Sequence, residues 1–245
     1  MKDKHFGITP NKEKSLFLAK REVSVLVLDA VNLEGINYTL PEVQTIMDGI
    51  TVGGHRIADQ QVVINQKNAW DKLFNLVKTG NFTLNKETVC NIHALSGFDD
   101  ALNWGEFRDN DVRIAGTDYL PPVADKLDSL FSNMVNEANK IEDIYDKAIY
   151  VFLDMARNQY FFDVNKRTGR FMMNGILLNE GYPIINVKAK DKLEFNTLMI
   201  EFYESNDTSK MNEFLRKSID EKTIEFMNQN KSKVKTKSKD FSQER

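Results

Sequence analysis

The chain has 245 residues, of which 41% are hydrophobic and 28% are charged, and its formal net charge is -3. This composition is typical of a globular protein with one main core, and the acidic balance argues against a dedicated nucleic-acid-binding protein. The only cysteine, Cys90, excludes an internal disulfide, and the apolar run 23–31 is too short to span a membrane. We therefore expect a cytoplasmic protein without a membrane partner.

The first helices are predicted near the N-terminus. Apolar residues spaced three and four apart over 12–33 predict a helix that ends at Gly35, because glycine readily adopts the left-handed conformation that closes helices. Thr39 and Glu42 then have the spacing of a capping box, with Pro41 in the first turn. A second helix is expected to begin there.

Helical periodicity continues through most of the chain and predicts an all-α fold. Further helices are expected over 60–78, 85–96, 141–158, 167–181, 191–204 and 208–228. The exception is a segment in which Phe107, Val112 and Ile114 flank a turn-prone run of Asp and Asn, before Pro121 and Pro122 end it. A small β-hairpin is predicted for this segment.

Four parts are expected along the chain. They are an N-terminal helical segment (1–50), a core (51–205), C-terminal helices (206–228) and a basic tail (229–245). Lysines alternate with Ser, Val and Thr in the tail, a composition that cannot bury a core. Disorder is one interpretation, and weak binding of nucleic acid or an acidic partner is the other.

A polar and basic cluster begins the stretch QYFFDVNKRTGRFMMNGILL. Its charged and amide side chains before the apolar run are Asp163, Asn165, Lys166, Arg167 and Arg170. The two arginines fall on one face of the predicted helix, and a helix N-terminus flanked by guanidinium groups suits phosphate. Asp163 offers an oxygen ligand for Mg²⁺. Spacing alone is equally consistent with a solvated helix start and ordinary salt bridges.

This cluster, preceded by Phe161, resembles the signature of the Fic (Fido) family, His-x-Phe-x-Asp/Glu-Gly/Ala-Asn-Gly/Lys-Arg-x-x-Arg. The segment NLEGINYTLPEVQTIMDGITVGGHRIADQ is similar to the N-terminal part of a bacterial Fic subgroup, and GEFRDNDVRIAG is similar to the family's flap hairpin. The resemblance covers most of residues 20–200. It implies an all-α Fic fold with a β-hairpin flap and, for active members, transfer of AMP from ATP to a target hydroxyl, with Mg²⁺ and ATP as cofactors.

The resemblance also implies roles for individual residues. Asp163 would bind Mg²⁺, and Asn165 with the loop backbone would hold the α-phosphate. Lys166 would add a positive charge, Arg167 would contact the bound phosphates and Arg170 the γ-phosphate. The flap residues implied to align a target segment by strand pairing are Arg108, Val112, Ile114 and Gly116.

The motif departs from the family pattern at two positions. Gln159 stands where the family has its catalytic histidine, and an amide has no basic lone pair to accept the hydroxyl proton. Loss of a general base costs on the order of a hundred- to ten-thousandfold in rate, although positioning and charge stabilisation survive. Val164 replaces a small residue, and a β-branched side chain resists positive φ and keeps the backbone away from a ligand. Lys166 does not decide between AMP transfer and the Doc-type transfer of phosphate.

Glu34 and Gly35 match the family's inhibitory motif, Ser/Thr-x-x-x-Glu-Gly/Asn, with Ala30 in place of the hydroxyl residue. The resemblance implies that Glu34 pairs with Arg170 and blocks placement of the γ-phosphate. The alternative is an ordinary carboxylate at a helix end.

Three functional hypotheses follow from these residues. The first is a slow enzyme that acts on a target protein. The second is a pseudoenzyme that needs no cofactor and binds a Fic paralogue, as an antitoxin-like regulator, and the third is a nucleotide sensor. Outside the motif, His55 is interpreted as a polar loop residue and His93 as a helix-packing residue, because the two lack metal-ligand spacing. Cys90 lies in an apolar helix pattern and is interpreted as a buried small hydrophobe rather than a nucleophile.

Overall fold

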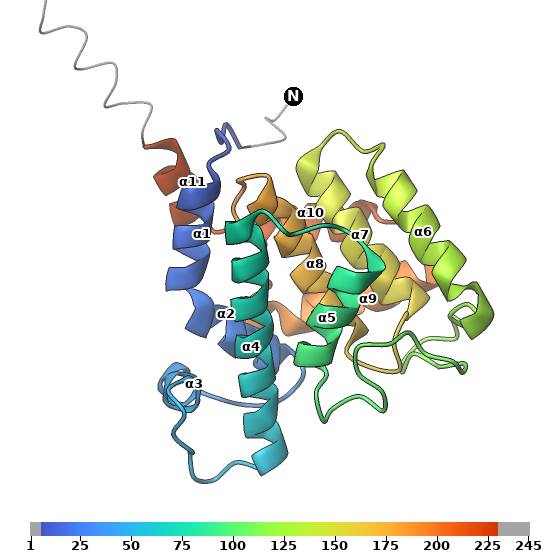
Figure 1. The fold of residues 1–245 in the computed structure, drawn as a ribbon, viewed down its shortest axis with the longest axis horizontal. Coiled ribbons are helices and arrows are strands. Elements are labelled where there is room, and N and C mark those ends of the chain that lie inside the picture. The colour runs from blue at the N-terminus through green and yellow to red at the C-terminus, as the bar shows by residue number, and fades with distance from the viewer. Residues whose placement is uncertain (1–5, 230–245) are drawn as a thin grey trace, which may run out of the picture.

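The computed structural model describes residues 6–229, and these residues form an all-helical fold (Figure 1). The α-helices are α1 (Lys12–Arg21), α2 (Val23–Leu33), α3 (Leu40–Met47), α4 (Ile57–Thr79), α5 (Lys86–Ser96), α6 (Leu127–Ala138), α7 (Ile144–Asn158), α8 (Asn165–Asn179), α9 (Lys192–Ser205), α10 (Ser209–Lys217) and α11 (Glu221–Asn228). The all-α prediction is confirmed. Nearly all of the predicted tail (229–245) lies outside the described residues. None of the described helices is long and apolar enough to cross a membrane.

Helices α7 and α8 lie side by side at the centre of the fold and are connected by a short loop (Figure 1). Glycine permits this close approach, because a Cβ on Gly169 of α8 would lie 3.1 Å from the Phe152 side chain and 3.2 Å from the Phe152 carbonyl oxygen of α7. Phe152 and Met155 are fully buried. The tight pairing holds the C-terminal end of α7 beside the N-terminal end of α8, where the polar motif lies.

The end of α2 is fixed by a Schellman motif. Gly35 has φ +92°, its N–H donates to the Asn32 carbonyl at 3.0 Å, and the Ile36 N–H donates to the Val31 carbonyl at 3.1 Å. The predicted glycine stop is therefore confirmed. Its consequence is that Glu34, the C-cap residue, has a defined position at the end of α2.

The predicted capping box of α3 is also present. The Glu42 carboxylate accepts hydrogen bonds from the Thr39 N–H at 2.8 Å and from the Thr39 hydroxyl at 2.7 Å. These bonds, with His55 3.1 Å away, hold the pKa of Glu42 at about 2. The His55 ring also stacks on the Tyr38 ring. His55 is thus a loop residue, as predicted, and it connects the loop after α2 with the loop before α4.

Two predicted helices are each divided in the structure. The helix expected over 12–33 breaks at Glu22, whose ψ is 5°, and becomes α1 and α2. The helix expected over 208–228 ends at Ser218 and starts again after Asp220, whose carboxylate accepts the Thr223 N–H at 2.9 Å. Asp220 is a good N-cap that the apolar periodicity obscured.

The predicted β-hairpin is wrong, because no strand forms among residues 6–229. The segment is instead tied to other parts of the fold. The Arg108 N–H donates to the Tyr160 carbonyl at 3.0 Å, and the Asp118 N–H donates to Glu204 of α9 at 3.0 Å. Since an isolated two-stranded hairpin is only marginally stable, these tertiary bonds decide the conformation.

Candidate functional site

Two residues in the left-handed conformation delimit the loop between α7 and α8. Gln159 closes α7 with φ +50°, and Val164 opens α8 with φ +60°. The expectation that valine would keep the backbone out of this conformation is wrong. Strain at such a position costs about 1–2 kcal/mol, and burial of the Val164 side chain, which is 3% exposed, returns a similar amount.

The Asn165 side chain stabilises this loop by hydrogen bonds within it. Its side-chain oxygen accepts the Phe161 N–H at 2.9 Å, and its amide nitrogen donates to the Phe161 carbonyl at 2.8 Å and to the Gln159 side-chain oxygen at 2.9 Å. The Gln159 amide in turn donates to the Ala156 carbonyl at 2.6 Å. Both side chains are thus engaged within the loop, and Asn165 is only 3% exposed. Its implied phosphate contact would require one of these bonds to open.

His93 of α5 packs against the buried side of the loop, which confirms its predicted role in packing. Its ring is fully buried and stacks on Phe161 with 3.7 Å between ring centroids. Nδ1 accepts the Gly105 N–H at 2.9 Å, so the proton lies on Nε2, which faces the Asp163 carbonyl at 3.3 Å.

Because His93 is buried in its neutral form, we expect the free energy of unfolding to depend on pH. Burial lowers the pKa of His93 to about 4, and Arg167 acts in the same direction. The folded-state pKa lies below the usual value of 6.5, so the contribution of neutral His93 to the free energy of unfolding is fully present above pH 6.5. This contribution falls by about 3 kcal/mol as the pH drops to 4. Urea unfolding between pH 7.5 and 4 should show a steeper loss for the wild type than for His93→Gln. Identical slopes in the two proteins would contradict this assignment.

Two arginines of α8 meet carboxylates from separate elements. Arg170 Nη2 lies 3.4 Å from Glu34 Oε1, and Arg167 Nε lies 4.0 Å from the same oxygen. Arg167 Nη2 also forms an ion pair with Asp100, in the turn after α5. The arginine side chains are 7% and 13% exposed, so both cations are held in a largely desolvated place. The expected contact between Glu34 and Arg170 is therefore formed.

A recess of about 280 Å³ opens beside Arg167. The residues that line it are Glu34, Ile36, Ala58, Asp59, Gln61, Val62, Asn65, Phe98, Asp99, Asp100, Asp163 and Arg167. Five of them are carboxylates and one is a cation, so the recess disfavours a polyphosphate unless a carboxylate moves away or a metal ion enters with the ligand. Arg167 Nη1 is buried and has no hydrogen-bond partner within residues 6–229, so it remains able to donate to an oxygen ligand.

Asp163 fits a magnesium ligand. Its side chain is exposed to the recess, and within residues 6–229 only Oδ1 has a hydrogen-bond partner, the Val164 N–H at 2.6 Å. One free carboxylate oxygen is enough where Mg²⁺ takes its other ligands from phosphate and water. A cluster of three metal-ligating side chains does not occur among the described residues.

The four predicted flap residues separate into two kinds. Arg108 is 2% exposed, and its guanidinium donates to carbonyl oxygens of Gln159 at 2.6 Å and Asn110 at 2.7 Å, so it holds the segment in place. Val112 and Ile114 are half-buried, and Gly116 is exposed with φ +84°. A role in docking a target stays a prediction for these three residues.

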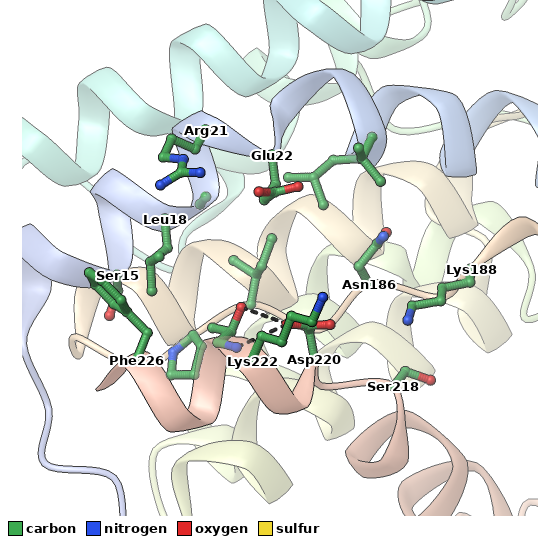
Figure 2. A pocket seen from close by; sticks show the side chains of 16 residues that line it. Ser15, Leu18, Arg21, Glu22, Asn186, Lys188, Ser218, Asp220, Lys222 and Phe226 are labelled. Atoms are coloured by element: carbon green, nitrogen blue, oxygen red, sulfur yellow. Dashed lines mark hydrogen bonds between the residues drawn. The ribbon is translucent and has the colours of Figure 1, made fainter. Parts of the chain in front are cut away.

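A second cavity, of about 440 Å³, lies between α1, α2 and α11 (Figure 2). Leu18 and Arg21 line it from α1, and Lys222 and Phe226 line it from α11 (Figure 2). Neither arginine of the motif lines this cavity, and it shares no lining residue with the recess. It is therefore separate from the candidate site.

Comparison with known proteins assigns the motif to a family. The model of the Fic/DOC family matches residues 83–177. These residues form a Fic/DOC family domain. Proteins named protein adenylyltransferase Fic from Drosophila persimilis and Drosophila mojavensis are 25% and 23% identical over 175 and 176 residues, which is 69% of this chain and 34% of each relative. The chain thus spans about a third of the length of these curated relatives.

Solved structures show that the fold extends beyond the matched residues. A fragment of Fic-1 from C. elegans superposes with a TM-score of 0.75 at 16% identity and covers 95% of this chain and 69% of that one. A Fic domain containing signaling protein from Bacteroides thetaiotaomicron gives a TM-score of 0.70 at 16% identity and covers 90% of both chains. The predicted helical Fic fold is confirmed.

The Fic domain alone does not complete the recess. Asp100, Asp163 and both arginines lie within residues 83–177, whereas Glu34 reaches them from α2, outside the matched region. Sequence reasoning found Glu34 through its motif but missed Asp100. The chain offers no periodicity or motif that links Asp100 to an arginine 67 positions away.

Proposed function

We propose that this chain binds Mg·ATP at the N-terminus of α8 and slowly transfers AMP to a hydroxyl group of a cytoplasmic target protein. The arrangement of Arg167 and Arg170 carries the proposal. Both cations flank the first turn of one helix, and their ion-pair partners are carboxylates, which an anionic ligand can replace. The adenylyltransferase name of the Drosophila relatives supports the same reaction.

The chain's own residues divide the work of holding the nucleotide. Arg167, Arg170 and the free N–H groups of the first turn of α8 would hold the phosphates. Asp163 would hold Mg²⁺, which when bound neutralises charge on the phosphate oxygens. The ion pair between Glu34 and Arg170 would keep the second arginine from the γ-phosphate until Glu34 moves.

The transfer step itself must proceed without a protein base at position 159. The target oxygen would form a bond to the α-phosphorus while the bond to the departing pyrophosphate breaks. The hydroxyl proton would pass to water, because the amide of Gln159 is not basic and is already bonded to Ala156 and Asn165. Positioning and charge stabilisation remain, so we expect slow transfer.

Labelled ATP tests the proposal. We expect Glu34→Gly, incubated with Mg·ATP and a cell extract, to attach label from the α-phosphate and none from the γ-phosphate. Adding Arg170→Ala to this variant should abolish labelling, which serves as the matched control. Label from the γ-phosphate would identify Doc-type phosphate transfer instead, and no label from either position would contradict an enzymatic function.

A binding function without chemistry is the second candidate. The observation that favours it is the engagement of Gln159 and Asn165 in a closed set of hydrogen bonds that stabilises the loop. Such a pseudoenzyme would act as an antitoxin-like regulator of a Fic paralogue that retains histidine. Co-purification with that paralogue and loss of its transfer activity would support this candidate, and absence of binding would contradict it.

A further inference from the structure

Arg167 has its own carboxylate partner, distinct from Glu34. Asp100 forms an ion pair with Arg167 Nη2, whereas the nearest contact to Glu34 is 4.0 Å from Arg167 Nε. The Arg167 side chain is 7% exposed and that of Asp100 is 33% exposed. Asp100 therefore reaches a largely buried cation from the solvent side of the recess, which is the side from which a ligand would approach.

The turn after α5 holds Asp100 in this position. The N–H groups of Asp100 and Ala101 both donate to the Gly97 carbonyl at 3.0 Å. Asn65 of α4 donates to the Phe98 carbonyl at 2.6 Å, and this bond anchors the turn to a neighbouring helix. Asp99 has φ +58°, in the left-handed region that Asp adopts more readily than most non-glycine residues. The turn thus presents Asp100 in a defined geometry.

We propose that Asp100 is a second anionic lock, which blocks Arg167 as Glu34 blocks Arg170. A polyphosphate that engages both arginines must displace both carboxylates, so removal of either one should strengthen binding. The proposal rests on the proposed phosphate-binding function and assigns a further residue to its control. Glu34 also contacts Arg167, at 4.0 Å, but Asp100 is the closer of the two carboxylates.

Tripolyphosphate is the probe that reports on the arginines without a nucleoside. We expect calorimetric titration to show that Asp100→Asn binds tripolyphosphate about three- to tenfold more tightly than the wild type. The double variant with Glu34→Gly should bind more tightly than either single variant. Asp100→Ala should behave like Asp100→Asn, and thermal unfolding would verify that each variant is folded.

Asp99→Asn is the matched control, because it removes the same charge from the adjacent position in the recess. If affinity for tripolyphosphate rises in Asp100→Asn but not in Asp99→Asn, the cause is loss of the ion pair with Arg167 rather than a general reduction of negative charge. Equal gains in the two variants would overturn the proposal. Equal or weaker binding in Asp100→Asn would also overturn it, since Asp100 would then only stabilise a buried cation.

Mg·ATP titrations of the same proteins separate this proposal from the proposed function. If tripolyphosphate binds with the expected order but Mg·ATP does not bind, the lock stands and the nucleotide function fails. If Glu34→Gly strengthens binding of Mg·ATP and Asp100→Asn has no effect on either ligand, the function stands and the lock fails. If the folded double variant binds neither ligand, both fail.

Discussion

Replacing Arg108 with methionine is expected to lower the free energy of unfolding by about 3–5 kcal/mol. The guanidinium is 2% exposed and donates to backbone carbonyls of Gln159, Asn110 and Asn158, as well as Pro122. Methionine keeps much of the apolar stem but leaves these carbonyl oxygens without their donor. Urea unfolding at neutral pH measures the change.

Arg113→Met in the same segment is the control for this prediction. Arg113 is exposed, so the corresponding change should stay within about 0.5 kcal/mol. A loss of less than 1 kcal/mol for Arg108→Met would show that the segment does not depend on the buried guanidinium.

Gln159→His in the Glu34→Gly background should raise the rate of AMP transfer about a hundred- to ten-thousandfold. Histidine at this position supplies the base that the amide lacks. The gain should appear in the initial rate of labelling from α-labelled ATP and should leave the affinity for Mg·ATP nearly unchanged.

Gln159→Asn separates a gain in basicity from a change in loop packing. Asparagine also loses the bonds to Ala156 and Asn165 but supplies no base, so it should give no increase in transfer. An equal gain in both variants would contradict the assignment of this position as the place of the missing base. No gain in Gln159→His, with nucleotide binding intact, would favour the binding function.

The sequence predicted those parts of the fold that depend on local chemistry. The left-handed Gly35 and the capping box of Thr39 and Glu42 are formed as expected, because each is decided within a few residues. The spacing of Arg167 and Arg170 likewise placed them on one face of α8, and both meet Glu34.

The errors arose where distant contacts decide the conformation. The hairpin is replaced by an irregular segment because Arg108 bonds to Gln159, which follows α7, and Asp118 bonds to α9, rather than to a neighbouring strand. Val164 adopts φ +60° against its local preference because burial of its side chain offsets the strain. The pair between Asp100 and Arg167 depends on a turn whose position is set by Asn65 in another helix. Local patterns contain no signal for such contacts.

We propose that Arg167 and Arg170 together bind phosphate and that Glu34 obstructs them. Calorimetric titration of Mg·ATP into the wild type, Glu34→Gly, and Glu34→Gly with both arginines changed to alanine tests it most directly. We expect binding to Glu34→Gly that is about tenfold tighter than to the wild type, and no binding once the arginines are removed. Absence of binding to a folded Glu34→Gly protein, or binding that persists without the arginines, would contradict a phosphate-binding role of Arg167 and Arg170.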